Sequence, residues 1–594
     1  MLQRPSFSLG PSSVLFLLGG VVALGCSAGT NEGSGGGGGS DSTGTKSTGS
    51  QNTGGGFGQG GGFGQGGGPG NEVGCSPDLK SVVDANGNIL TTCPPDQGCA
   101  AGMCVPACDA AAASKGSIGC DWLIATPDFY TGITPPCFAA FVTNNWDKDL
   151  VIDVSRGGVS YDATTFGRIA QSDPNVGSWP AVPATGLPPG EVAVLFLSDD
   201  PSSVNGGPLT CPIQPAVRTG GGTAVIGTGL GTAWHIQTDA PGTMYDILPY
   251  GGALSYLPSA ELVQPTTAWG TNYVAVLPPA SSGPSWGQIV ASEDATTVQI
   301  LPSVSLPGGG SVPALNPNVQ GTLTLQKGQY VQWRGPEMTG SIIQSDKPIA
   351  FTGGDGYQCY SSATSSGGGC DSGHQQIPAI SALSDQYIGM AFASRIGGAE
   401  SIPYRIVGVT DGTTLTFDPP VPSAPATLSL GQSVQFEAST SFKVTSQDKD
   451  HPFYLGQVMP GAGCAGDEDF VNMLPPAQWL AKYVFFSDPT YPTTNLVFVR
   501  AKTNGTFADV NLECYGTVTG WQPIGSAGEY EITTVDLIRE SVPNGACTNG
   551  PQVASSTAPF GLQVWGLSSC SSYSYPAGGN ASTINTVVVP PVPR

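Results

Sequence analysis

The stretches IVASEDATTVQILP (289–302) and IVGVTDGTTLTFDPP (406–420) decide the fold, because they are two copies of one pattern. Each copy has an apolar run, an acidic turn and a Thr-Thr pair that opens a second alternating run, which is typical of two β-strands joined by a tight turn. The neighbouring segments repeat as well, which is the signature of a repeat architecture. LTLQKGQYVQW (323–333) matches LSLGQSVQF (428–436), with LPPGEVAVLFL (187–197) as a weaker copy, and TGSIIQSDKPIAFTGG (339–354) matches SFKVTSQDKDHPFYLGQ (441–457), with GTAWHIQTDAPGTMYDI (231–247) in the earlier position.

The repeats predict an all-β fold built from tandem antiparallel β units over residues 137–594. We expect three fuller units and a degenerate last one that includes 495–516. Two arrangements are open: β-sandwich-like units packed edge to edge, which we favour, or a closed propeller-like ring, since four-stranded repeats also build propeller blades. Helix is scarce, with a turn or two expected in the connectors AELVQPTTAW (260–269) and AQWLAKY (477–483).

The composition agrees with a β-rich chain and excludes one class of partner. Only 11% of the 594 residues are charged, while Gly (87) and Pro (52) are abundant. The net charge of -23 would be repelled by a nucleic acid backbone, so we expect no nucleic acid partner.

The N-terminus predicts an exported lipoprotein. Residues 1–25 have a basic Arg4 and a short apolar run (12–24), as a signal peptide does. ALGC (23–26) resembles a lipobox, in which Cys26 carries the lipid and anchors the chain to the membrane, although an ordinary signal peptide with an incidental cysteine is the alternative. Ser27 after the cysteine favours the outer membrane or cell surface.

A low-complexity segment and a cysteine-rich module separate this leader from the repeats. Residues 26–71 are mostly Gly, Ser, Thr, Gln and Asn and cannot bury enough apolar surface to fold, so we expect a disordered tether. Residues 72–136 form a small module in which Asn86-Gly87 predicts a type I′ hairpin turn. Cys93, Cys99, Cys104 and Cys108 lack the paired spacing of structural zinc sites, which favours disulfides. Without Cys26 the chain has 14 cysteines, an even set whose connectivity the sequence leaves open.

Several motifs together resemble the IgGFc-binding protein N-terminal domain family over roughly residues 110–590. They are GCDW (119–122), CFAAFVTNNW (137–146), the repeated Thr-Thr strand pairs, the S-D-K-P strands and the C-D…H…Q-x-P connector at 370–378. A Gly-rich insertion between Cys359 and Cys370 departs from the family pattern. The resemblance implies a secreted or surface-held binding module, and it does not imply that this chain binds immunoglobulin.

One loop, CYSSATSSGGGCDSGHQQIP (359–378), gathers groups that could bind a metal. Cys359, Cys370 and His374 would supply three zinc ligands, but exported cysteines at this spacing more readily close a loop, so we favour a Cys359–Cys370 disulfide. His374 is then expected to pack or hydrogen-bond near Gln375 and Gln376.

The other candidate groups for chemistry are few. Asp467, Glu468 and Asp469 could bind calcium, although a solvated loop is the favoured interpretation. His235 lies in a predicted strand, and His451 lies in a turn where simple exposure is expected. We therefore expect no metal site and no cofactor.

The sequence predicts a non-enzymatic binding or adhesion module for an extracellular protein or glycan, held at the membrane by a lipid on Cys26. GPSWG (283–287) fits a nucleophile motif by letters alone, because a strand rather than a helix is predicted after its serine. A structural envelope protein without a ligand is the alternative. A β-scaffold hydrolase that uses carboxylates such as Asp371 or Asp467 is less favoured.

Overall fold

The structure is a computed structural model that describes residues 73–593 apart from positions 281 and 366. The predicted signal peptide (1–25), Cys26 and the predicted tether (26–71) therefore lie outside the described residues. The described residues belong to one compact unit, Gly60–Arg594. No helix among them is long and apolar enough to cross a membrane.

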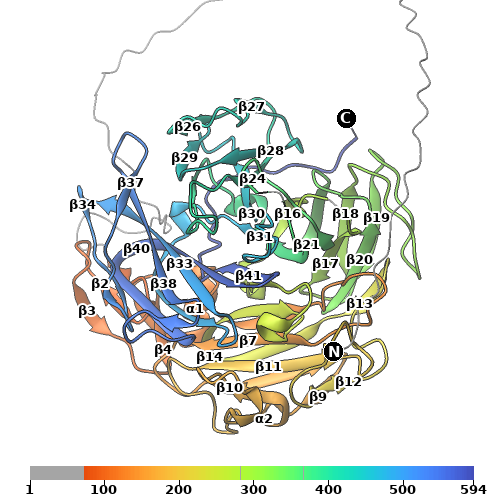
Figure 1. The fold of residues 1–594 in the computed structure, drawn as a ribbon, viewed down its shortest axis with the longest axis horizontal. Helices are drawn as coiled ribbons and strands as arrows, with labels where there is room; N and C mark the ends of the chain where they lie inside the picture. Colours follow the sequence, from red (N-terminus) through yellow and green to blue (C-terminus); the bar gives the residue numbers. More distant parts are fainter. Residues whose placement is uncertain (1–72, 281, 366, 594) are drawn as a thin grey trace, which may run out of the picture. The chain divides into compact units, whose positions relative to one another are not determined.

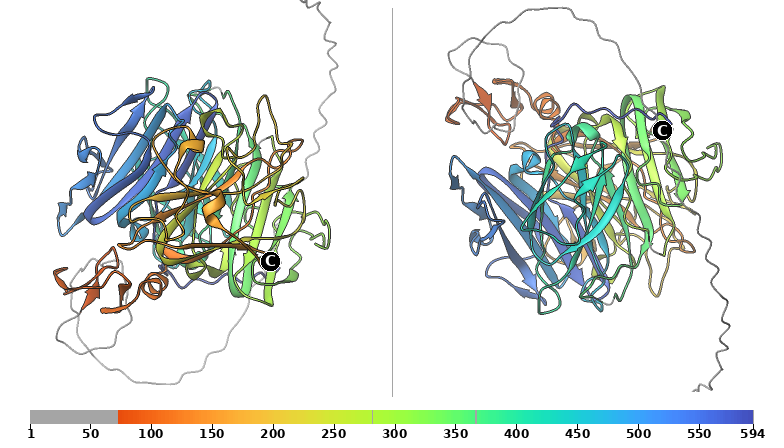
Figure 2. Two further views of the ribbon diagram at one scale, coloured as in Figure 1. Left: turned by 90° about the horizontal axis from the view of Figure 1, so that it is seen from below. Right: turned by 90° about the horizontal axis from the view of Figure 1, so that it is seen from above.

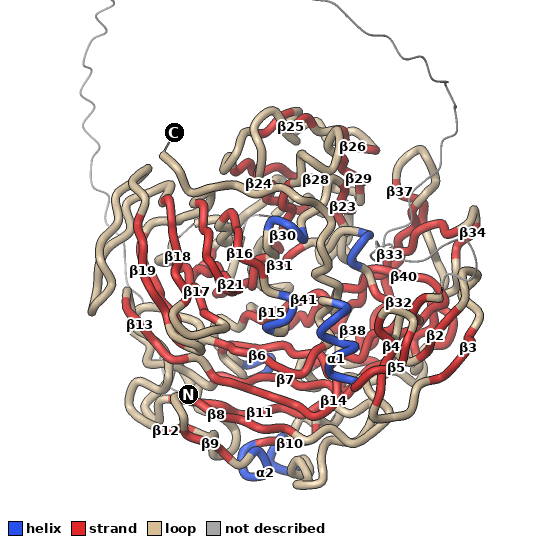
Figure 3. Tube along the Cα trace, turned by 180° about the vertical axis from the view of Figure 1, so that it is seen from behind, coloured by secondary structure: helices blue, strands red, loops and turns tan. Residues whose placement is uncertain are grey.

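The prediction of an all-β chain is confirmed. Strands dominate, as the red segments of Figure 3 show. The described residues hold two short α-helices, α1 (Ala107–Ser114) and α2 (Ala163–Phe166), and a few 3-10 turns. These turns are η1 (Val176–Ser178), η2 (Gly252–Leu254), η3 (Thr266–Ala268), η4 (Ile380–Ala382) and η5 (Pro476–Gln478). The two connectors expected to hold a helical turn each hold one 3-10 turn, η3 and η5, followed by a strand.

The repeats fold into four antiparallel units, and the second unit gives the pattern. Its sheet orders the strands β13-β20-β17-β21-β18-β19, with β16 and β22 also paired to β21. The bounds are β13 (Gly229–Thr232), β16 (Gly270–Val274), β17 (Ser285–Ala291), β18 (Thr296–Leu301), β19 (Gly321–Leu325), β20 (Gln329–Gly335), β21 (Ile342–Gln358) and β22 (Asp371–Ile377).

The other units keep the same order of elements. The first has β6 (Gly119–Ile124), β7 (Phe138–Asn144), β8 (Ile152–Arg156), β9 (Val159–Tyr161), β10 (Gly167–Ile169), β11 (Val192–Asp199), β12 (Val217–Arg218), β14 (Trp234–Leu248) and β15 (Ser259–Val263). The third has β23 (Gln386–Gly389), β24 (Ile402–Gly408), β25 (Thr413–Thr414), β26 (Thr416–Asp418), β27 (Thr427–Leu428), β28 (Ser433–Ala438), β29 (Phe442–Thr445), β30 (Phe453–Met459) and β31 (Asp469–Asn472). The fourth has β32 (Leu480–Ser487), β33 (Thr493–Thr503), β34 (Thr506–Phe507), β35 (Val510–Leu512), β36 (Gly516–Thr517), β37 (Gln522–Ile524), β38 (Tyr530–Arg539), β39 (Val542–Pro543), β40 (Gly550–Ser568) and β41 (Ser571–Pro576).

In the first, second and fourth units, one long bent strand (β14, β21 or β40) curls the sheet into two facing halves. In β21, the residues before the bend pair with β16 and β18, and the residues after it pair with β17 and β22. Ser-Asp-Lys-Pro (345–348) is the bend inside this strand. The corresponding bend of the third unit is a true break, between β29 and β30.

The four units close into a ring through their last hairpins, which we call the inner hairpins. These are β14–β15, β21–β22, β30–β31 and β40–β41. β15 packs against β22, β22 against β31, β31 against β41, and β41 against β15. Figure 1 shows the units in sequence order around these hairpins, from yellow through green and teal to blue. The units are therefore arranged as a ring, which is one of the two arrangements that the sequence left open. Within a unit, the two halves of the sheet face each other as the layers of a sandwich do.

Neighbouring units share their hydrophobic cores, which explains why the units stay together. One core joins Phe141 and Tyr245 of the first unit to Phe486 and Tyr575 of the fourth. Other cores join the second unit to the third and the third to the fourth. Because each unit buries apolar surface against the next, the ring is the stable structure.

The expectation of a degenerate last unit is wrong. The fourth unit is a ten-stranded sheet with the longest strand of the described residues, β40. Its two-residue and three-residue strands β34–β37 lie between the main strands and obscure the repeat in the sequence. The fold therefore has four full units.

The cysteine-rich segment forms a small module beside the first unit. It contains the strands β1 (Gly74–Cys75), β2 (Ser81–Val83), β3 (Ile89–Thr92), β4 (Gln97–Ala100) and β5 (Met103–Pro106). β2 and β3 form the predicted hairpin, but only Gly87 in its loop has a positive φ (83°), so the turn is not type I′. α1 packs against β6 and β14, and β6 itself pairs with β14 in the sheet of the first unit.

The C-terminal segment returns across three units. The backbone N–H of Asn580 donates to Gln478 O, and that of Ile584 donates to Ser381 O. The Val589 N–H donates to Asn272 Oδ1, and Asn272 Nδ2 donates back to Val589 O. Figure 2 shows the segment running from the blue fourth unit toward the green second unit. We call residues 577–589 the C-terminal latch.

Candidate functional site

The tips of the inner hairpins gather into one rim. They are residues 249–258, 359–370, 460–468 and 569–570, in unit order. β-bridges join Gly367 to Ala462 and Gly466 to Ser569, and a Cys464–Cys570 disulfide links the third tip to the fourth. At the other junction, the Ala253 N–H of the first tip donates to Thr490 Oγ1 of the fourth unit, 2.8 Å away.

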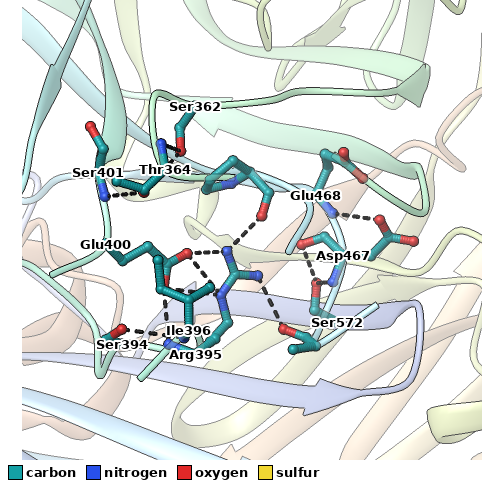
Figure 4. Close-up of polar contacts among 12 residues, drawn as sticks. Ser362, Thr364, Ser394, Arg395, Ile396, Glu400, Ser401, Asp467, Glu468 and Ser572 are labelled. Atoms are coloured by element: carbon teal, nitrogen blue, oxygen red, sulfur yellow. Dashed lines mark hydrogen bonds and ion pairs between the residues drawn. The ribbon is translucent and has the colours of Figure 1, made fainter. Parts of the chain in front are cut away.

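The second tip is closed on itself. Cys359 and Cys370 form a disulfide in the structure, so neither thiol is free to ligate zinc. The tip also forms hydrogen bonds to neighbouring segments. The Tyr360 N–H donates to Glu468 Oε1 (2.9 Å), and the Ser401 N–H donates to Thr364 Oγ1 (2.7 Å). Figure 4 shows Ser362 and Thr364 of this tip beside Glu400 and Ser401.

Arg395 ties the loop that follows β23 to the third tip. Its guanidinium forms an ion pair with Glu400, and both side chains are almost completely buried. The same guanidinium donates to Pro460 O (2.6 Å) and Ala465 O (3.3 Å) (Figure 4). The guanidinium therefore makes these contacts inside the protein, where it holds the loop after β23 against the third tip.

A buried acidic group lies beneath the tips, and its burial corrects one prediction. Asp467, Glu468 and Asp469, expected in a solvated loop, are 1%, 0% and 0% exposed because the neighbouring tips cover them. Asp371 of β22 lies with them and accepts a hydrogen bond from the Ser572 N–H (3.2 Å). Burial raises the pKa of Asp371, Asp467 and Asp469, and burial with a hydrogen bond to Asp467 raises the pKa of Glu468 to about 9.

A groove of about 430 Å³ opens between the third and fourth tips. Arg395, Arg539 and Glu540 line it together with the Cys464 side of the disulfide. Arg539 is half exposed and pairs with Asp536, so it presents a charge to the groove. The volume falls in the range of small-ligand sites, roughly 300–1,000 Å³.

The first tip is the most apolar part of the rim. Leu254 in η2 is 97% exposed. Tyr256 of the same tip packs edge-on against Tyr130, and Tyr130 packs against Tyr357 at the base of the second tip. An exposed leucine beside half-buried aromatic rings is the kind of surface that protein and glycan partners contact.

His374 lies in the interior, between the first and second inner hairpins. Its Nε2 is 2.8 Å from Asp246 Oδ1, and Asp246 pairs across β14–β15 with Glu261. The backbone of His374 also donates to Ser259 Oγ. The sequence singled out His374 but missed both acidic partners, which are more than 100 residues away in the chain. Glu261 gave the one available signal, as a charged residue inside the apolar run AELV.

The remaining sequence candidates have ordinary structural partners. Cys75–Cys99, Cys93–Cys104 and Cys108–Cys120 are disulfides of the cysteine-rich module. Cys137–Cys211 and Cys514–Cys547 complete a set that uses every cysteine of the described residues. His235 contacts Asp121 (2.7 Å), and the exposed turn of His451 holds its Nδ1 2.6 Å from Asp448.

Comparison with known proteins identifies the family. The sequence pattern described as IgGFc binding protein matches residues 259–566, just over half of the chain. The chain therefore belongs to the IgGFc-binding family. This is a family of binding domains and not of enzymes, so membership indicates a binding module. No curated protein matches the chain, and no solved structure matches it.

Proposed function

We propose that the protein is a surface-anchored lipoprotein that binds an extracellular protein or glycan with the rim of hairpin tips. The observation that carries the proposal is the rim itself: four loops from different units beside the 430 Å³ groove, the second to fourth joined by bridges and a disulfide and the first hydrogen-bonded to the fourth unit. Loops on a rigid β scaffold are where binding specificity usually resides, because the scaffold removes most of the entropy cost of ordering them.

The rim offers two kinds of contact. Leu254 and the tyrosines of the first tip supply apolar and aromatic surface, while Arg539 and the groove supply charge and hydrogen bonds. Arg539 also stands out in a chain of net charge -23, because an anionic group of a ligand could approach it there. We expect the ligand to contact both parts.

The test is a direct binding measurement with the full chain. The immobilised protein is probed with a glycan array and with purified host proteins, immunoglobulin Fc among them, and hits are measured by surface plasmon resonance. Leu254→Ser and Arg539→Met should each weaken binding at least about 10-fold, as removal of a central contact residue does. Val159→Ser, also exposed but on β9 away from the tips, is the control. Binding that survives both rim substitutions would place the ligand site elsewhere.

Anchoring through Cys26 is tested separately. Cells that express the full chain are labelled with a radioactive fatty acid, and the protein is located by membrane fractionation. We expect label on the wild-type chain in the outer membrane fraction and none on Cys26→Ser. A labelled Cys26→Ser chain would contradict the lipid anchor.

The two alternatives differ in what they predict. A structural envelope protein would bind none of the probes, yet its deletion would weaken the envelope. For a hydrolase, the buried position of Asp371 and Asp467 counts against substrate access, since both are at most 1% exposed.

A further inference from the structure

The junction of the first and second units contains a convergent set of metal-ligating groups. Asp246 and Glu261 form a cross-strand pair on β14–β15, and His374 reaches them from β22. One ligand atom from each residue lies within 4.8 Å of the other two. Two carboxylates and an imidazole around one point are a donor set for a divalent cation.

The surroundings compensate these carboxylates only in part. Asp246, Glu261 and His374 are 1%, 5% and 1% exposed. Asp246 Oδ2 and Glu261 Oε2 are buried and accept no hydrogen bond in the described structure. Neither residue forms an ion pair with a lysine or arginine among the described residues. Buried carboxylate oxygens without partners are costly, and one such oxygen on each acid points to a further positive group between them.

The fold itself does not require this arrangement. The pair that corresponds to Asp246–Glu261 is Gly353–Gln375 in the second unit, Gln457–Val471 in the third and Val564–Tyr575 in the fourth. The positions that correspond to His374 are Ala260, Phe470 and Ser574. Three ring junctions therefore close without these groups, and packing alone does not explain them in the first.

We propose that Asp246, Glu261 and His374 bind one divalent transition-metal cation of the zinc class, which clasps the first unit to the second. The imidazole favours such a cation over Ca²⁺ and Mg²⁺, which prefer oxygen ligands alone. The site is independent of the rim, and it stabilises the ring rather than contacting the ligand. Because it is buried, the cation enters during folding.

The experiment follows metal retention through refolding. The full chain, with its disulfides intact, is unfolded in guanidinium with a chelator and refolded with Zn²⁺, Mn²⁺ or Ca²⁺. After desalting, metal per chain is measured by mass spectrometry and the thermal midpoint by calorimetry. We expect about one Zn²⁺ per chain and a raised midpoint, since a cation that binds only the folded state stabilises it.

Two variants and a control decide the assignment. Glu261→Gln and His374→Gln each remove a metal ligand and should each weaken Zn²⁺ binding at least about 100-fold. This loss is larger than the loss expected for a residue that only hydrogen-bonds to a ligand. Glu468→Gln, a buried acid outside the set, should retain Zn²⁺ as the wild type does. Near-ultraviolet circular dichroism checks folding, and Glu261→Gln alone decides if His374→Gln does not fold. Wild-type protein that retains no Zn²⁺, retention of Ca²⁺ in its place, or a Glu261→Gln chain that keeps its Zn²⁺ would overturn the proposal.

Discussion

The first and third inner hairpins use the same fold element in different ways. Both place carboxylates in the interior of the ring: Asp246 and Glu261 on the first, and Asp467, Glu468 and Asp469 on the third. The carboxylates of the first converge with His374 and pair with no lysine or arginine among the described residues. Those of the third are spread along the strand, near Arg395 and several backbone donors, and their tip is cross-linked to the fourth unit.

The difference teaches that the number of acidic residues does not define a metal site. The third hairpin carries more carboxylates, and its run of three acids looks more like a cation site in the sequence. Among the described residues, however, no three of these acids converge on a point. Its acids are part of a cross-linked structural junction. The first hairpin carries fewer acids, and those meet an imidazole from another unit.

The largest expected effect comes from the cross-link of the third tip. Cys464→Ser with Cys570→Ser opens a loop of 106 residues and should lower the free energy of unfolding by about 4.7 kcal/mol in the chain-entropy account. Cys359→Ser with Cys370→Ser opens an 11-residue loop and should cost about 2.8 kcal/mol. Guanidinium denaturation of both variants measures the difference. Equal losses would show that the third tip is not a special junction.

The second effect concerns the cation that serves the third hairpin. Arg395→Met leaves Glu400 buried without its partner and should lower the free energy of unfolding by about 3 kcal/mol or more. Arg539→Met removes a half-exposed ion pair and should cost less than about 1 kcal/mol. The same denaturation curves compare them, and equal losses would show that Arg395 does not hold the third tip in place.

The third effect is a pH dependence of the third hairpin. Because the pKa of Glu468 is raised to about 9, the folded protein holds a proton that the unfolded chain releases above about pH 4.5. Stability from this group is therefore lost as the pH rises from about 5 to 9. Asp467, Asp371 and Arg395 surround the group. Glu468→Gln has no such proton to release, so it should lose less stability than the wild type across this range. Parallel stability curves for the two proteins would contradict the buried proton.

The smallest effect belongs to the exposed tip of the first hairpin. Leu254→Ser should change the free energy of unfolding by less than about 0.5 kcal/mol, because the side chain is 97% exposed. Leu257→Ser in the same tip should cost about 3 kcal/mol, because Leu257 is 2% exposed. Thermal denaturation compares them. A destabilised Leu254→Ser chain would indicate that another surface covers this tip.

The repeated strands were predictable because they depend on local pattern. Two strands begin at the repeated Thr-Thr pairs, β18 (Thr296–Leu301) and β25 (Thr413–Thr414). The bends lie at the S-D-K-P and D-K-D-H-P segments. The fourth unit was expected to be degenerate because its short extra strands hide the period.

The candidate site was less predictable because it depends on contacts between units. Asp467 reads as part of an exposed loop, and only the neighbouring tips bury it. His374 reads as a solitary histidine, because Asp246 is 128 residues away and meets it only when the ring is closed. Local sequence carries no signal for either fact.

The C-terminal latch has a consequence for the order of events in the cell. Protein synthesis proceeds from the N-terminus, so β15 and Asn272 are made before β41 and residues 577–589. β41 packs against β15, and the Val589 N–H donates to Asn272. The packing of the first and second units is therefore complete only after the fourth unit and the latch have been made. A chain cut short before these residues would present the bare face of β15 to proteases. The latch thus makes the protected state of β15 depend on the synthesis of β41 and residues 577–589.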